Sequence, residues 1–184
     1  MKLRASWART AKWLITIAVG GVVATTGDHL HVVYGVLFYP HPAFLRQASW
    51  VLPLFAAATA AMLAGSELVR KALGGEVVAT SVGDALLATG AFFVAYAFTA
   101  VAAELPSFVL VVLVVTWLGR ARSMPRWVFA YALVSAVCGV GFEAGLSRIG
   151  GFAYVSPDWL GVPRWLPGLY LHAALAAARI RGLL

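Results

Sequence analysis

Apolar residues gather in six runs along the chain, separated by short stretches of polar residues, glycine and proline. A helix needs roughly 20 apolar residues to cross the hydrocarbon core of a bilayer, and most of the runs approach that length. The fourth run is shorter, so we expect it to take residues from its flanks, and Pro106 separates it from the third run. The pattern predicts six membrane-spanning helices, over residues 13–33, 50–69, 81–103, 105–118, 127–146 and 165–180.

The composition fits a chain that is surrounded by lipid. Hydrophobic residues make up 62% of the 184 residues, and charged residues only 11%. A soluble domain carries about twice that charged fraction, because it has to cover its surface with polar groups. We therefore predict a single domain over residues 1–184, an all-α polytopic membrane protein built as a six-helix bundle.

The basic residues indicate the orientation of the helices. With a cytoplasmic N-terminus, most of the 14 Lys and Arg residues fall in cytoplasmic segments: Lys2, Arg4, Arg9, Lys12, Arg70, Lys71, Arg120, Arg122, Arg126, Arg179 and Arg181. The outer loops hold only Arg46, Arg148 and Arg164. The positive-inside rule then places both termini in the cytoplasm. This distribution explains the net charge of +7 without nucleic acid. The richness in Arg, Ala, Val and Gly indicates a bacterial cytoplasmic membrane.

Three residues receive structural interpretations. Asp84 follows Ser81 at the start of the third helix, in the spacing of a capping box. Glu67 lies at the cytoplasmic end of the second helix beside two basic residues, where we expect a charge in the interface. Cys138 lies within an apolar run, so we expect it to be buried as a small hydrophobic side chain.

Other polar residues fall near the outer ends of the helices: Asp28, His29, Glu104, Glu143 and Arg148. Structural ion pairing is the simplest interpretation of this outer polar cluster, and a site for a ligand head group is the alternative. A small transporter or an intramembrane enzyme would use Asp28, His29, Glu104 and Glu143. We expect no metal site, because His29 and His31 are two positions apart and therefore point to different sides of a helix.

The predicted helices place no acidic or basic residue other than His172 at the middle of the membrane. Transporters and channels generally need charge or a polar pore at that depth, so we predict ligand binding without catalysis. An interior with hydrogen-bonding groups but no fixed cation favours a bound neutral lipid over a phospholipid head. The expected ligand-binding residues are Thr59, Thr89, Phe92, Phe93, Tyr96, Thr99, Ser135, Phe142, Glu143 and His172.

Small residues are frequent in the predicted helices, and they let helices approach closely. Gly141 and Gly145 have the spacing of a small-xxx-small motif in the fifth helix. We predict a homo-oligomer on this basis, with close packing inside one bundle as the alternative use of these residues.

Several motifs lie at the ends of the predicted helices. Residues 154–160 read Tyr-Val-Ser-Pro-Asp-Trp-Leu, and residues 164–167 read Arg-Trp-Leu-Pro before the sixth helix. Residues 50–53 read Trp-Val-Leu-Pro, and residues 120–123 read Arg-Ala-Arg-Ser. In order and position these motifs resemble those of the Insig family, six-helix membrane proteins of the endoplasmic reticulum that act in sterol regulation.

The resemblance implies that the helix bundle senses a lipid or a sterol without catalysis. It also implies partner binding, but Gly119 stands where the family has an aspartate that is associated with sterol-sensing-domain partners. We therefore do not expect this chain to bind such partners. The family points to a sterol ligand, whereas a bacterial source favours diacylglycerol, which shares a neutral hydroxyl head on a large apolar body.

Overall fold

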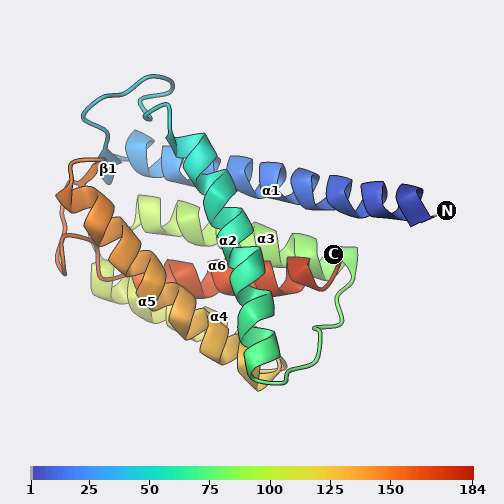
Figure 1. Cartoon of the computed structure of the whole chain (residues 1–184). Coiled ribbons are helices and arrows are strands. Elements are labelled where there is room, and N and C mark those ends of the chain that lie inside the picture. Colours follow the sequence, from blue (N-terminus) through green and yellow to red (C-terminus); the bar gives the residue numbers. More distant parts are fainter. Residues whose placement is uncertain (1) are drawn as a thin grey trace.

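The computed structural model describes the backbone of residues 2–184, with the side chains of residue 7 and of residues 10–184. Six helices and two short strands follow one another: α1 (Lys2–Val33), β1 (Leu37–Phe38), α2 (Val51–Ala72), α3 (Val82–Val101), α4 (Pro106–Ala121), α5 (Arg126–Arg148), β2 (Ala153–Tyr154) and α6 (Leu166–Arg181). They form one bundle, and Figure 1 shows both termini at the same end of it.

The six predicted helices are confirmed, with changes at their ends. Four of them, over Thr10–Val33, Val51–Ala72, Val82–Val101 and Arg126–Arg148, are long and apolar enough to cross a membrane. Helices α4 and α6 are shorter, with 16 residues each. Helix α1 begins well before the predicted residue 13, at Lys2. The side chains of Lys2, Arg4 and Arg9, which support the predicted orientation, lie outside the described side chains.

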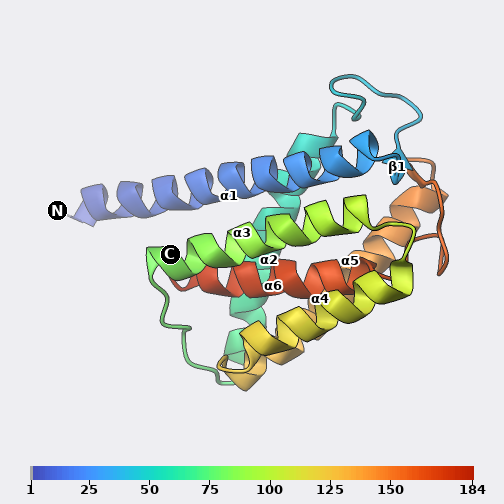
Figure 2. The same cartoon turned by 180° about the vertical axis from the view of Figure 1, so that it is seen from behind.

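Helix α6 is the centre of the bundle. It packs against α2, α3, α4 and α5, and Figures 1 and 2 show it enclosed by its neighbours from both sides. Its side chains from Leu171 to Ala178 are all buried. Five alanines in this helix keep its radius small, so the surrounding helices can approach it closely. This enclosure explains how a helix of only 16 residues can lie inside a membrane protein.

A small sheet that the hydrophobic pattern did not predict covers the outer end of the bundle. Strand β1 follows α1, strand β2 follows α5, and the two pair antiparallel with Phe38 opposite Ala153. Each strand has two residues, too few for a recognisable alternation of apolar and polar positions. The sheet connects two loops that are far apart in the sequence and holds them over the interior.

Two local predictions have different outcomes. The capping box at the start of α3 is confirmed, because the Ser81 hydroxyl accepts a hydrogen bond from the Asp84 backbone and the Asp84 carboxylate accepts one from the Ser81 backbone. The prediction of a buried Cys138 is wrong, since this residue is exposed on the outside of α5. The expected apolar surroundings are lipid or another chain, which the amino-acid type alone does not distinguish from a protein core.

The orientation of the bundle stays a prediction, and cysteine labelling in intact cells tests it. In a Cys138→Ser background, a Ser123→Cys variant should react with a membrane-impermeant maleimide only after permeabilisation. A His41→Cys variant, in the exposed loop after β1, should react without permeabilisation. The reverse pattern would contradict the orientation that the basic residues indicate.

Candidate functional site

The bundle contains two adjoining cavities, and the larger lies between α1, α2, α3 and α6. Its walls enclose about 760 Å³, counting its open mouth. Small residues on facing helices leave this space, among them Gly20 and Ala24 on α1 and Ala173 and Ala176 on α6. We call it the inner cavity, because it extends along α6 as far as Ile180, near the end that is predicted to be cytoplasmic.

A second cavity of about 560 Å³, the outer cavity, lies toward the end that the sheet covers. It is lined by polar and aromatic side chains that include Asp28, Tyr39, Trp50, Phe152 and Tyr154. The two cavities share wall residues, namely Phe55, Ala58, Tyr96, Glu143, Leu169 and Tyr170. The site is therefore an elongated space with an apolar inner part and a more polar outer part.

The first carboxyl group of the outer cavity belongs to Asp28 in the last turns of α1. Its Oδ2 accepts a hydrogen bond of 2.7 Å from the Tyr39 hydroxyl and another of 2.7 Å from Gln47 Nε2. Gln47 also donates to the Thr25 carbonyl at 3.0 Å. Burial, followed by the adjacent charge of Asp28, raises the pKa of Tyr39 above its ordinary value. Tyr39 therefore stays protonated and acts as a donor to Asp28.

The second carboxyl group belongs to Glu143 on α5. The Tyr154 hydroxyl donates to its Oε2, and the Tyr170 hydroxyl donates to its Oε1 at 2.7 Å. Burial and then the charge of Glu143 raise the pKa of Tyr154, which therefore also remains a donor. Glu143 thus points inward to the junction of the two cavities, at the wall that they share.

No Lys or Arg is found among the described residues that line either cavity. A basic side chain of another type, that of His31, is buried in the wall of the outer cavity. Its Nε2 lies 2.9 Å from Thr99 Oγ1, and that hydroxyl donates to the Tyr96 carbonyl at 2.8 Å. Because the hydroxyl proton is already used, Thr99 accepts here and His31 Nε2 carries the proton. The neutral form of His31 satisfies this contact, so it adds no fixed positive charge.

The predicted ligand-binding residues divide between the cavity walls and other places. Those in the walls are Thr59, Thr89, Phe92, Tyr96, Phe142 and Glu143. Phe142 lines only the outer cavity, and Glu143 lines both. Whether any of these residues contacts a ligand stays a prediction.

Four of the predicted residues line neither cavity. Phe93 follows Phe92 on α3, so the helical turn directs it to a different face. Thr99 is fully buried in its contact with His31. Ser135 lies on α5 away from both cavities. The fourth is His172.

Helix α6 is surrounded by helices, and only one of its sides faces the cavities. His172 lies on another side, which faces α4. Its Nε2 lies 3.0 Å from the Leu113 carbonyl, and its Nδ1 lies 3.2 Å from Arg120 Nη1. Arginine has no acceptor, so Nδ1 accepts from Arg120 and Nε2 donates to the carbonyl. His172 is thus a packed histidine that is bonded to a neighbouring helix.

The outer polar cluster does not form as one group. Asp28 and Glu143 both line the outer cavity, but Glu104 is exposed in the turn between α3 and α4. Arg148 is also exposed, and His29 is absent from the described walls of both cavities. The transporter or enzyme hypothesis, which needs four converging side chains, therefore keeps only two of them. Sequence reasoning missed their partners Tyr39, Tyr154 and Tyr170.

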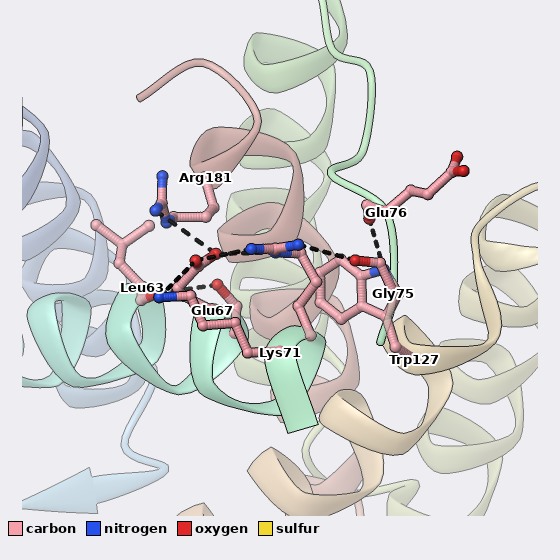
Figure 3. Close-up of polar contacts among 9 residues, drawn as sticks. Leu63, Glu67, Lys71, Gly75, Glu76, Trp127 and Arg181 are labelled. Atoms are coloured by element: carbon pink, nitrogen blue, oxygen red, sulfur yellow. Dashed lines mark hydrogen bonds and ion pairs between the residues drawn. The ribbon is translucent and has the colours of Figure 1, made fainter. Parts of the chain in front are cut away.

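At the end of the bundle that is predicted to be cytoplasmic, Glu67 joins α2 to the end of α6. Figure 3 shows its carboxylate beside Lys71 and Arg181, with N···O distances of 3.4 and 3.5 Å. Arg70 pairs with it at 2.8 Å and also donates to the Gly75 carbonyl. The contact of Glu67 with Arg181 on α6 could not be predicted from neighbours in sequence, and its place at the membrane interface stays a prediction.

We expect Glu67→Gln to lower the thermal unfolding midpoint in detergent by a few degrees. The substitution leaves three cations close together without their shared anion, although exposure to solvent limits the cost. Glu76→Gln is the matched control, because Glu76 is exposed and contributes only its backbone carbonyl, which accepts from Trp127 Nε1. Equal midpoints for the two variants would contradict a stabilising role for Glu67.

Comparison with known proteins places this geometry in a family. No family model matches the chain. An Insig protein homologue from Mycolicibacterium vanbaalenii is 32% identical over 92% of this chain and 85% of its own length. The crystal structure of MvINS, the mycobacterial Insig homologue from Mycobacterium vanbaalenii, is similar with a TM-score of 0.78 and 26% identity, covering 94% of this chain and 93% of the other.

A second crystal structure, of a cross-linked trimer of MvINS, matches equally well, with a TM-score of 0.78, 27% identity and the same coverage. The similarity extends over nearly the whole of both chains. The identity to the curated homologue and the shared fold lead to one conclusion: this chain is an integral membrane protein of the Insig family.

Proposed function

We propose that this Insig-family protein binds a neutral, membrane-resident lipid with a hydroxyl-bearing head, and that it acts by binding, without catalysis. The observation that carries the proposal is the elongated cavity inside a lipid-surrounded bundle. Its inner part is lined largely by alkyl groups, and its outer part presents two carboxyl groups and four tyrosines. A lipid with a small polar head matches both parts at once.

The charge of the cavity argues against a phospholipid. A buried phosphate needs a cation or several hydrogen-bond donors, and otherwise its desolvation is costly. The described walls contain no Lys or Arg, and Asp28 and Glu143 would repel an anion. A hydroxyl group, in contrast, can donate a hydrogen bond to either carboxyl group, with a contribution of about 1.5–3 kcal/mol to a charged acceptor.

Diacylglycerol and sterols both belong to this ligand class. The Insig family is associated with sterol regulation, and the relative found here comes from a mycobacterium. A bacterial cytoplasmic membrane, which we propose as the location of this chain, offers diacylglycerol more readily than sterol. We therefore favour diacylglycerol as the ligand, and packing of its chains in the inner cavity would provide specificity for lipids of a suitable shape.

Binding of paired lipids to protein in nanodiscs tests this function. Dioleoylglycerol and dioleoylphosphatidic acid have the same two chains and differ in the phosphate. We expect saturable binding of the diacylglycerol, and at most background binding of the phosphatidic acid. Preference for the phosphatidic acid, or no saturable binding of either diacylglycerol or cholesterol, would contradict the proposal.

We also propose that the chain forms a homo-oligomer, and a trimer is the favoured state because MvINS has been crystallised as a cross-linked trimer. Gly141 and Gly145 lie on α5 with open space where a side chain would begin, and Cys138 is exposed on the same helix. Small residues at an open helix surface allow a second helix to approach. The absence of the family's aspartate at Gly119 argues against sterol-sensing-domain partners.

Native mass spectrometry in mild detergent tests the association, and we expect three chains per complex. Gly141→Leu should shift the population to monomers, because the larger side chain keeps a facing helix away. Gly90→Leu is the control, since Gly90 also has open space around it but lies on α3. Monomers of the wild-type chain at every concentration would contradict the homo-oligomer.

A further inference from the structure

The α1–β1–α2 and α5–β2–α6 segments repeat one another in sequence. Tyr39 follows Asp28 by 11 positions, and Tyr154 follows Glu143 by 11 positions. At the same relative positions, further identical residues follow in both segments: Gly35 and Gly150, Pro42 and Pro157, Leu45 and Leu160, Trp50 and Trp165. An acidic residue, a tyrosine and a tryptophan thus recur at constant spacing.

The backbone repeats with the same register. After α1, Gly35 donates to the Val32 carbonyl, and after α5, Gly150 donates to the Ser147 carbonyl. Both glycines have a positive φ, 70° and 79°, which favours glycine at this turn.

The turns that follow also match. Phe44 is bridged to Gln47, and Trp159 is bridged to Val162. In both turns the two central residues have a positive φ, which is the pattern of a type I′ turn. Leu45 and Leu160 adopt this conformation although they are not glycine. Two segments of different sequence context therefore fold in the same way.

The sheet lies on the two-fold axis that relates the segments. Phe38 and Ala153 occupy equivalent positions in the repeat, and they are paired opposite each other in the antiparallel strands. Pairing of a position with its own equivalent is what a two-fold axis produces. Both helices that precede the strands run in the same direction through the predicted membrane, so the axis is along the membrane normal, as in other parallel membrane repeats.

The repeat brings two equivalent acid–tyrosine pairs to one cavity. Asp28 with Tyr39 and Glu143 with Tyr154 all line the outer cavity. Each carboxyl group has two neutral donors, because Gln47 also donates to Asp28 and Tyr170 also donates to Glu143. Both donors to Asp28 bind its Oδ2, and no described protein group donates to its Oδ1. The remaining acceptor capacity of both carboxyl groups is available to a ligand.

We propose that the outer cavity is a head-group site with two equivalent acceptor positions, so that its preferred ligand carries two hydroxyl donors, as in a vicinal diol. This inference rests on the proposed function and refines it: diacylglycerol, with one hydroxyl group, occupies one of the two acceptor positions, and a lipid with two hydroxyl groups binds more tightly. One hydroxyl donates to Asp28 and the other to Glu143, on opposite sides of the pseudo-two-fold axis. The alkyl chain then extends from the shared wall near Tyr96 into the inner cavity.

The hydrogen-bond directions favour hydroxyl donors over other head groups. The hydroxyl protons of Tyr39, Tyr154 and Tyr170 are already directed at the carboxyl groups, so these three are not free for an ester or phosphate oxygen. Each carboxyl group is already stabilised by two neutral donors, so the site does not require a cation. A hydroxyl group of the ligand would be the third neutral donor to each carboxyl group.

Competition by two lipids that differ in one hydroxymethyl group tests the inference. 1-Monooleoylglycerol has two hydroxyls, and ethylene glycol monooleate has one on the same oleoyl chain. In wild-type protein we expect the diol to displace labelled dioleoylglycerol at about a tenfold lower concentration, since one hydrogen bond to a charged acceptor is of this magnitude. Asp28→Asn and Glu143→Gln should each reduce this preference to near unity.

The possible results separate the two proposals. Equal competition by both lipids in wild-type protein would overturn the two-hydroxyl inference while leaving lipid binding intact. Stronger competition by oleylamine than by 1-monooleoylglycerol would also overturn it, because the acids would then hold a cation. Failure of every lipid to bind would instead contradict the proposed function. If neither variant folds, the preference of the wild-type protein for 1-monooleoylglycerol over ethylene glycol monooleate decides whether the site takes two hydroxyl groups.

Discussion

Ala173→Phe is expected to abolish most lipid binding, with bound lipid reduced at least tenfold. Ala173 is buried on α6 and lines the inner cavity, so the ring has to enter the space that an alkyl chain would occupy. Overfilling a packed interior costs roughly 1–3 kcal/mol, and about 1.4 kcal/mol is a tenfold change in affinity. Ala176→Phe, one turn further along the same wall, should have the same effect.

The control for this prediction is the same substitution on a surface that faces lipid. Ala57 is exposed on α2 and is absent from both cavity walls, so Ala57→Phe should leave binding unchanged. Lipid extraction and quantitative mass spectrometry of the purified variants give the ratio of lipid to protein. A folded Ala173→Phe variant with the same lipid content as the wild-type protein would show that the lipid binds outside the inner cavity.

Glu143→Leu is expected to be the most destabilising single change in the site. Leucine cannot accept hydrogen bonds, so the hydroxyls of Tyr154 and Tyr170 would both lose their acceptor. An unpaired buried hydroxyl costs about 1–3 kcal/mol, and two of them would take a large share of the stability of a small bundle. Thermal unfolding in nanodiscs, monitored by tryptophan fluorescence, should show a lower midpoint.

A compensating variant separates lost hydrogen bonds from lost packing. Adding Tyr154→Phe and Tyr170→Phe to Glu143→Leu removes all three polar partners, and this should recover most of the lost stability. The two Tyr→Phe changes without Glu143→Leu should remain destabilising, because the buried carboxyl group then has no protein donor among its described contacts. No recovery in the triple variant would show that the shape of Glu143, and not its hydrogen bonding, is important.

Hydropathy and charge are sufficient to predict the six helices, although not their ends, because a segment that crosses the hydrocarbon core has to be predominantly apolar. The turn before Pro106 and the capping box at Ser81 follow from local chemistry in the same way. The central place of α6 is harder to predict, because its alanine content is equally compatible with a lipid-facing helix. Burial in a membrane protein cannot be deduced from hydrophobicity, as exposed Cys138 illustrates.

The candidate site is only partly predictable, since depth along a helix does not give direction. Glu143 is near the outer end of α5 as predicted, but its side chain points inward to tyrosines from a loop and from another helix. His172 is at mid-helix as predicted, but it points to α4 and not to a cavity. These directions depend on contacts between residues that are distant in the sequence.

One sequence signal could have identified the outer cavity. The identical spacing from Asp28 to Tyr39 and from Glu143 to Tyr154 is visible in the sequence, together with Trp50 and Trp165. A search for internal repeats would have paired the two acids and indicated a shared site. The hydrophobic pattern hides this relation, because α2 and α6 differ in length and composition.

Native mass spectrometry of protein extracted gently from its own membrane tests the central claim most directly, because it identifies what the cavity holds without added ligand. We expect one neutral, hydroxyl-bearing lipid per chain that survives gas-phase removal of loosely bound phospholipid and is missing from Ala173→Phe. Recovery of phospholipid alone, in equal amounts from wild-type protein and from Ala173→Phe, would contradict a neutral-lipid site within the bundle.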